Sequence, residues 1–145
     1  MAAGKPCVFC EIARGERVAP VVYEDEAVLA FLDHRPLFPG HVLVVPRQHR
    51  ETLIDLDPGE IAAVFGFARR VAAAVEIALG AEGSFVAVNN RVSQSVPHLH
   101  VHVVPRRRKD GLRGFFWPRN PYRDPAHVEE VRAALAEALE SARGA

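Results

Sequence analysis

The histidine-rich stretch that decides the fold reads Val96-Pro97-His98-Leu99-His100-Val101-His102-Val103-Val104-Pro105, with three histidines at alternate positions. Successive side chains of an extended strand point to opposite faces, so the stretch predicts three imidazoles on one face and aliphatic side chains on the other. Neutral imidazole can be a nucleophile, a general base or a metal ligand. The stretch therefore predicts a phosphate-transfer site or a metal site.

The composition predicts one globular domain over residues 1–145, because 49% of the residues are hydrophobic and no repeat or linker divides the chain. Lys and Arg number 18 and Asp and Glu also 18, so no general attraction to nucleic acid or membrane is expected. The sequence has no apolar run that could span a bilayer, and the first residues lack the apolar core of a signal peptide. We therefore expect a cytoplasmic protein.

Short hydrophobic runs separated by turn residues predict an α+β fold, an antiparallel sheet of about five strands with a long helix packed on one face. The long helix is expected to start after Asp57, with Pro58 in its first turn and Glu60 completing a capping box, and to end at Gly80. The strands are expected at residues 21–24, 28–32, 41–46, 85–88 and in the histidine stretch. Further helices are expected at residues 9–13 and 128–143.

The two cysteines, Cys7 and Cys10, lie too close together to staple a fold, which leaves metal binding or redox chemistry. His49 and His98 could complete a tetrahedral Cys₂His₂ site that holds a structural zinc ion. Such a site would remove His98 from catalysis and leave the next two histidines free. No organic cofactor is expected.

The loop at residues 89–95 carries amides and hydroxyls up to the histidines. It can be a simple turn, or it can supply neutral hydrogen-bond donors to an anionic transition state. We favour the second interpretation for Gln94 and Ser95, because they enter the same stretch as the histidines.

The segment His98-Leu99-His100-Val101-His102-Val103-Val104 resembles the motif of the histidine triad (HIT) nucleotide hydrolase family. Further similarity extends from Cys7 to Pro105, which marks a core at about 7–105 and an extension with a helix at about 106–145. The matching blocks are residues 9–12, 23–26, 30–33, 39–49 and 94–96. The resemblance implies a homodimer in which two sheets join and the long helices pair.

The resemblance also implies an activity, the cleavage of a phosphoramidate or phosphoanhydride bond to the α-phosphate of a purine nucleotide. His100 would attack the phosphorus to form a nucleotidyl-histidine, with a backbone carbonyl fixing its tautomer. His102 stands where the nucleotidyltransferase branch has Gln, so the hydrolase branches are the better match. The other catalytic positions are His41, Gln94 and Ser95.

By the same resemblance, the nucleotide would be bound by Asp33 at the ribose and by Phe9, Ile12, Phe31 and His34 at the base, with Asn89 nearby. The ligands of zinc-bearing members match Cys7, Cys10, His49 and His98. The chain departs from the family where Ser93 replaces a usual Gly and Asn89 lies closer to the histidines.

Two other functions compete with this interpretation. The three histidines could be ligands of an open, catalytic zinc site. Alternatively, the chain could bind a nucleotide or nucleic acid without catalysis. Residues 106–119 mix basic and aromatic side chains, which could bind nucleic acid, extend the active site toward the leaving group, or pack on the domain or on a partner subunit.

Overall fold

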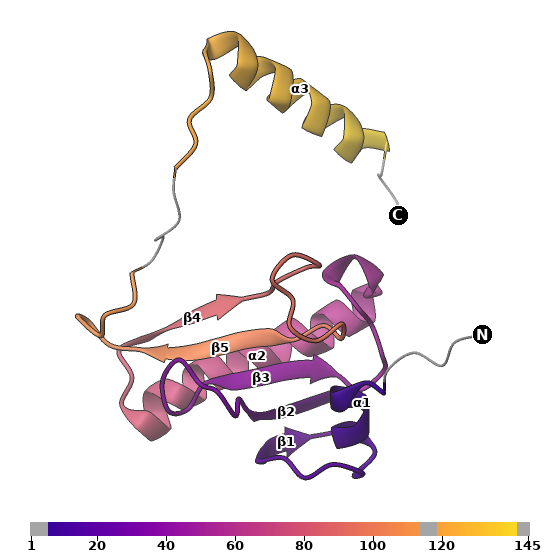
Figure 1. Cartoon of the computed structure of the whole chain (residues 1–145), viewed down its shortest axis with the longest axis vertical. Helices are drawn as coiled ribbons and strands as arrows, with labels where there is room; N and C mark the ends of the chain where they lie inside the picture. Colours follow the sequence, from indigo (N-terminus) through magenta and orange to yellow (C-terminus); the bar gives the residue numbers. More distant parts are fainter. Residues whose placement is uncertain (1–5, 114–118, 142–145) are drawn as a thin grey trace. The chain divides into compact units, whose positions relative to one another are not determined.

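The computed structural model describes residues 6–113 and 119–141, which fall into two compact units, Met1–Asp110 and Gly111–Ala145. Figure 1 shows the elements in colours that follow the chain. In order they are α1 (Val8–Ala13), β1 (Val21–Glu24), β2 (Val28–Leu32), β3 (Val42–Pro46), the 3₁₀ turn η1 (Leu53–Asp55), α2 (Pro58–Leu79), β4 (Gly83–Ala87), β5 (Val101–Arg106) and α3 (Pro125–Ser141). The single domain expected over residues 1–145 stays a prediction.

Unit 1 contains one five-stranded sheet with the strand order β1-β2-β3-β5-β4. Every neighbouring pair is antiparallel, and the central register pairs Ala30 with Val44 and Leu43 with His102. Helix α2 covers one face of this sheet (Figure 1). The α+β fold predicted from the sequence is therefore confirmed.

Helix α2 begins and ends where its sequence predicts. The Asp57 carboxylate accepts a hydrogen bond from the Glu60 backbone N–H at 2.7 Å, and the Glu60 side chain reaches back to complete the capping box. Gly80 ends the helix in the left-handed region at φ 65°, which glycine adopts without steric cost. The buried face of the helix packs on the sheet through Val64, Phe67, Ala68, Val71 and Val75.

The central strands are buried on both faces, and alternation sorts their side chains into two clusters. Ala30, Val44 and Val101 pack under α2. Leu29, Phe31, Leu43 and Val45 pack on the other face with Phe9 of α1. Since His102 alternates with Val101 and Val103, it lies on the α1 face, away from α2.

Strand β5 begins later than the sequence predicts, because the first two triad histidines lie before it. The His98 backbone N–H bonds locally to the Val96 carbonyl, and the Leu99 N–H bonds to the Arg50 carbonyl. Pro97 has no N–H, and those of His98 and Leu99 are used in these bonds, so pairing with β3 starts only after these residues, at Val101. The extended strand predicted at His98 and His100 was therefore wrong, although both rings contact Phe9 on the α1 face, at centroid distances of 5.7 and 5.2 Å.

The C-terminal helix α3 has no buried residue. The helix begins at Pro125, three residues before the predicted start at residue 128. Residues 142–143 of the predicted helix lie outside the described residues. None of the helices in the described ranges combines the length and hydropathy needed to cross a membrane.

Candidate active site and metal centre

His100 is buried, and its ring is fixed by a backbone group. Its Nδ1 lies 2.8 Å from the carbonyl oxygen of His98. Because a carbonyl only accepts hydrogen bonds, Nδ1 must carry the proton and Nε2 must keep its lone pair. The ring contacts Phe9 edge-on at a centroid distance of 5.2 Å and His102 at 4.9 Å. The bond to His98 therefore leaves Nε2 as the unprotonated nitrogen of the ring.

A second chain of hydrogen bonds fixes His41 and His102. The Leu37 backbone N–H donates to His41 Nδ1 at 3.1 Å, so the proton of that ring sits on Nε2. His41 Nε2 lies 2.9 Å from His102 Nδ1 and donates to it. His102 consequently carries its own proton on Nε2. The two triad rings thus offer opposite groups, a lone pair on His100 and an N–H donor on His102.

Burial keeps these imidazoles neutral. Desolvation is the main cause that lowers the pKa of His41, His100 and His102, to about 4 for His102. The neighbouring imidazole of His100 lowers the pKa of both His41 and His102 further, while the Asp33 carboxylate raises all three. The tautomers derived above therefore describe the site at neutral pH.

The donor atoms of Asp33, His41 and His102 lie within 4.8 Å of one another, which raises the question of a metal. The two ring nitrogens are 2.9 Å apart with ring centroids 5.1 Å apart, so they point nearly at each other. An ion between them would need about 4 Å, twice the usual metal–nitrogen distance of about 2.0–2.1 Å. The contact is a hydrogen bond.

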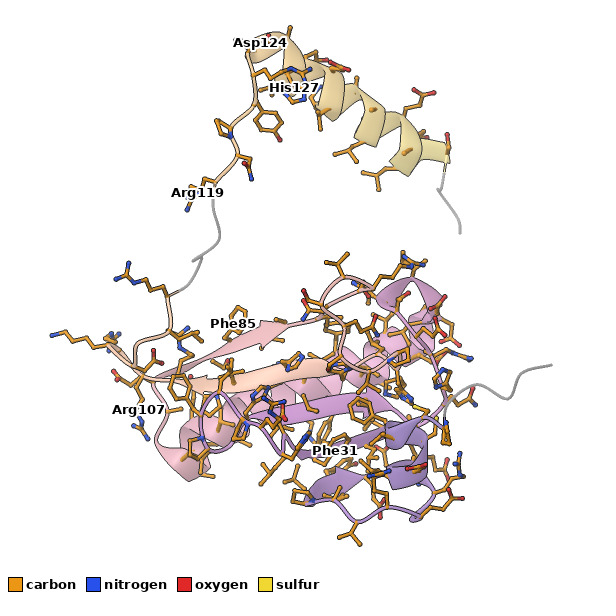
Figure 2. All side chains as sticks on the ribbon, viewed as in Figure 1. Phe31, Phe85, Arg107, Arg119, Asp124 and His127 are labelled. Carbon is orange, nitrogen blue, oxygen red and sulfur yellow. The ribbon has the colours of Figure 1, made fainter. Side chains whose placement is uncertain are left out.

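A cavity of about 350 Å³ opens beside these rings. It is lined by eight of the residues that the sequence analysis assigned to catalysis or nucleotide binding. They are Phe9, Ile12, Phe31, Asp33, His34, Ser95, His100 and His102. Phe31 is labelled on β2 in Figure 2. The cavity also has a wall at residues 17–20, which carry no recognisable motif and which the sequence analysis missed.

Asp33 joins the histidine chain to the cavity. Its Oδ1 accepts a hydrogen bond from the Arg35 backbone N–H at 2.9 Å, and its Oδ2 lies 3.7 Å from His41 Nε2. The side chain is 16% exposed, and it lines the cavity. The carboxylate is therefore held as a hydrogen-bond acceptor at the cavity wall.

Three of the residues predicted for catalysis or nucleotide binding do not line the cavity. His41 lies behind His102 and acts through it. The Gln94 amide donates to the Glu51 carbonyl at 2.6 Å and accepts from the Arg91 N–H at 2.8 Å, while the Asn89 amide donates to the Ser93 carbonyl. Gln94 and Asn89 therefore stabilise the loop through hydrogen bonds to backbone groups.

The same loop contains Ser93, which stands where the family usually has Gly. Its φ is 59° and that of Arg91 is 66°, in the left-handed region that favours glycine. Ser93 adopts the backbone conformation for which the family's usual Gly is suited. The loop beside the site is thus strained at two residues.

The four predicted zinc ligands converge. Cys7 Sγ lies 3.4 Å from His98 Nδ1, and Cys10 Sγ lies 3.4 Å from His49 Nδ1 and 3.5 Å from His98 Nδ1. These distances match the about 3.5 Å expected between sulfur and nitrogen ligands across a tetrahedral zinc ion. His98 Nε2 donates to the Pro46 carbonyl at 2.8 Å, so Nδ1 turns its lone pair toward the cysteines. The donor set fits zinc.

The triad histidines do not share one ion in this arrangement, because each ring faces a different partner. His98 faces the cysteines, His100 turns Nδ1 to a carbonyl, and His102 turns Nδ1 to His41. An open metal site built from these three rings would require all of these hydrogen bonds to change.

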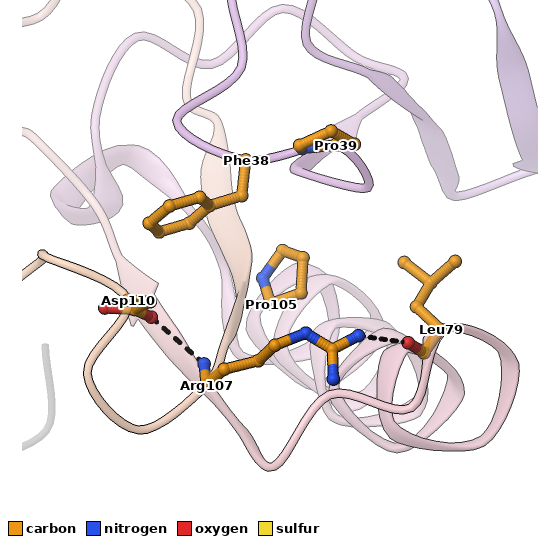
Figure 3. A pocket seen from close by; sticks show the side chains of 6 residues that line it. All are labelled: Phe38, Pro39, Leu79, Pro105, Arg107 and Asp110. Atoms are coloured by element: carbon orange, nitrogen blue, oxygen red, sulfur yellow. Dashed lines mark hydrogen bonds between the residues drawn. The ribbon is translucent and has the colours of Figure 1, made fainter.

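Arg106, Arg107 and Arg108, the first basic residues of the segment, do not line the cavity. Arg107 donates to the Leu79 and Gly80 carbonyls at 2.6 and 2.7 Å and so caps the C-terminus of α2 (Figure 3). Arg106 pairs with Asp110 and Arg108 with Glu82. The hollow at Arg107, also about 350 Å³, contains none of the histidines. Residues 114–118, which hold the predicted aromatic run, lie outside the described residues.

Comparisons with known proteins agree on one family. The HIT domain model matches residues 14–109. An uncharacterised HIT-like protein of Mycobacterium tuberculosis is 39% identical over 137 residues, which cover 91% of this chain and 94% of the relative. The adenylylsulfatase HINT3 of Arabidopsis thaliana is 37% identical over 108 residues, 73% of this chain and 55% of that protein. The crystal structure of a zinc-bound histidine triad family protein from Mycobacterium smegmatis is 40% identical, with a TM-score of 0.72 over 97% of this chain and 100% of that one.

Proposed function

Because this chain belongs to the HIT domain family, we propose that it cleaves a phosphoramidate or phosphoanhydride bond at the α-phosphate of a purine nucleotide. The single observation that carries the proposal is the hydrogen bond from His100 Nδ1 to the His98 carbonyl, which leaves Nε2 unprotonated in a ring that lines the cavity. The Arabidopsis relative is named an adenylylsulfatase, which supports a purine nucleotide as the substrate.

The proposed reaction has two steps. In the first, the His100 Nε2 lone pair forms a bond to the α-phosphorus while the bond to the leaving group breaks, and the leaving group departs with the electron pair and takes a proton from solvent water. In the second, water attacks the phosphorus and gives a proton back to solvent, the bond to Nε2 breaks with its electron pair returning to the His100 ring, and a nucleoside monophosphate is released. An amine acceptor or another nucleophile in place of water would make the reaction a transfer.

His102 and Ser95 are the proposed partners of the phosphate. The Nε2–H of His102 and the Ser95 hydroxyl are neutral donors at the same cavity as His100. Donors that are already fixed before the reaction stabilise the negative charge that develops on the phosphate oxygens. His41 is a positioning residue, since it fixes the proton of His102.

The rest of the cavity suits a nucleoside. Asp33 offers carboxylate oxygens to ribose hydroxyls, and Phe9, Ile12, Phe31 and His34 offer surfaces for a base. Gln94 and Asn89, which form hydrogen bonds to backbone carbonyls, would hold Ser95 in place rather than contact the phosphate.

Zinc, when bound, would stabilise the fold and would not take part in the reaction. Cys7, Cys10, His49 and His98 would fill all four positions of a tetrahedral ion and leave none for water. These residues come from the start of α1, where Cys7 is the N-cap, from the segment after β3 and from the stretch before β5, so the ion would connect three parts of the chain. The zinc-bound Mycobacterium smegmatis structure supports this proposal.

A homodimer in the cytoplasm remains part of the proposal. Strand β4 is an outer strand of the sheet, and its Val86 is 45% exposed. Ile61 of α2 is exposed as well. Pairing of the β4 strands of two copies would cover Val86 and Ile61, and it would satisfy the backbone groups at the outer edge of β4.

A substrate panel tests the proposed function. Purified protein would be incubated with nucleoside phosphoramidates, dinucleoside polyphosphates and nucleoside diphosphates, and nucleoside monophosphate release would be measured by chromatography. We expect release from at least one class by the wild type and none by His100→Ala. Binding of the nucleotides without release from any class would contradict the proposal and favour a non-catalytic nucleotide-binding module.

A further inference from the structure

Arg17 lines the cavity but belongs to none of the matched sequence motifs. Its Nε donates to the Glu11 carboxylate of α1 at 2.8 Å, and the two side chains are 51% and 19% exposed respectively. Within the described ranges, its two Nη groups donate to no protein acceptor. The guanidinium is thus oriented on one side and has free donors on the other.

The neighbours of Arg17 place it with the apolar wall rather than with the phosphate donors. It is followed by Val18, Ala19 and Pro20, which all line the cavity, and its ion pair ties it to α1 next to Ile12. The donors proposed for the phosphate, Ser95 and His102, belong to a different segment of the chain. Arg17 is thus tied to the segment that holds Ile12, one of the residues proposed to contact the base.

The ion pair also sets what Arg17 can recognise. The Glu11 carboxylate at 2.8 Å offsets the positive charge of the guanidinium, which makes the pair a poor clamp for a phosphate. The remaining N–H groups still form a planar fork that donates to two acceptors side by side.

Purine bases differ at the edge that such a fork recognises. Guanine presents two acceptors, O6 and N7, whereas adenine presents the N7 acceptor beside the N6 amino donor. Resting on the proposed function, we infer that Arg17, held by Glu11 at the apolar wall of the cavity, is a specificity-determining residue that makes the site prefer 6-oxopurine nucleotides over adenine nucleotides.

The test compares three bases on one reaction. The substrates are the phosphoramidates of guanosine, inosine and adenosine with one common amine, and the dissociation constants of GMP, IMP and AMP are measured in parallel by calorimetry. Inosine keeps O6 and N7 but lacks the 2-amino group, so it isolates the edge that Arg17 would contact. The variant is Arg17→Met, which keeps the aliphatic stem. Its matched control is Arg14→Met, since Arg14 pairs with Glu16 at the surface and does not line the cavity.

We expect guanosine and inosine substrates to exceed adenosine about tenfold in kcat/KM, because Arg17 is half exposed and so gives the low end of what a bidentate pair contributes. Arg17→Met should bring the ratio close to one through KM, and Arg14→Met should leave it unchanged. A ratio near one in an active wild type would overturn the inference, as would an equal loss for all three bases, which would indicate a phosphate contact. If no substrate is cleaved, the proposed function fails, and the GMP, IMP and AMP affinities still decide the role of Arg17.

Discussion

His98 and His100 are joined by a hydrogen bond of 2.8 Å from the His100 ring to the His98 backbone carbonyl, and the His98 ring itself faces Cys7 and Cys10. One residue thus connects the two centres of the chain. Its side chain would bind zinc, and its backbone fixes the tautomer of the proposed nucleophile. The short helix α1 makes a second connection, because Cys10 Sγ lies 3.5 Å from His98 Nδ1 while Phe9 contacts His100.

Replacing Cys10 with Ser tests the zinc centre. We expect the zinc content to fall from about one ion per chain and the melting temperature to fall with it, because metal binding and folding are coupled. Since α1 has only six residues and three of them, Val8, Phe9 and Ile12, line the cavity, KM for the nucleotide should rise more than kcat falls. Metal analysis, calorimetry and steady-state kinetics measure the three effects. Full zinc occupancy in this variant would contradict the ligand assignment.

Replacing His102 tests its role as a neutral donor. His102→Leu should lower kcat about 10²–10³-fold, as the loss of one preorganised donor does elsewhere, and His102→Gln should lose less because its amide can donate. The pKa of His102 is lowered to about 4, so its ring stays neutral as the pH falls from 8 to 5.5. The ratio of wild-type to His102→Gln activity should therefore stay flat over this range. A ratio that changes several-fold would show that the charged imidazolium takes part.

Asp33 is expected to accept hydrogen bonds from the ribose hydroxyls. Asp33→Asn keeps the size of the side chain but weakens its acceptor oxygens, so KM for ribonucleotides should rise about tenfold. A 2′,3′-dideoxy substrate lacks the hydroxyls that the carboxylate would accept from and should be affected much less. Kinetics on matched ribose and dideoxyribose substrates give the comparison. An equal effect on both sugars would assign Asp33 to the histidine chain alone.

The strained loop gives a prediction about stability. Ser93→Gly should raise the free energy of unfolding by about 1 kcal/mol, because the φ of 59° is costly for a residue with a side chain and easy for glycine. Ser84→Gly in β4 is the matched control and should lower stability instead. Urea denaturation of both variants measures the difference. A destabilised Ser93→Gly protein would mean that the loop is not strained at this position.

Local patterns made much of this protein predictable. The capping box at Asp57 and Glu60 depends only on residues close in sequence, and so do the alternating residues of β2 and β3. The spacing of Cys7 and Cys10 pointed to a metal, and imidazoles from other parts of the chain completed the set. In these cases the pattern that predicts the feature lies within one helix or strand, or in one type of side chain.

The remaining features depend on partners that no local pattern reveals. The start of β5 at Val101 follows from the bonds of His98 and Leu99 to Val96 and Arg50. A polar residue such as Gln94 has the same sequence signature whether it braces a loop or contacts a substrate, and only its bonds to Glu51 and Arg91 distinguish the two. Arg17 reaches the cavity through an ion pair to another element.

The proposed reaction depends most directly on His100, and chemical trapping tests the role of this residue. The wild type would be mixed with a nucleoside phosphoramidate that carries a radioactive α-phosphate, quenched in alkali during the first turnover, digested and analysed by mass spectrometry. We predict a nucleotidyl group on the peptide that contains His100, localised to that residue, and no adduct with His100→Ala, whose turnover falls by several orders of magnitude while nucleotide affinity stays within about tenfold. An adduct on another residue, or near-normal turnover by His100→Ala, would contradict the central claim.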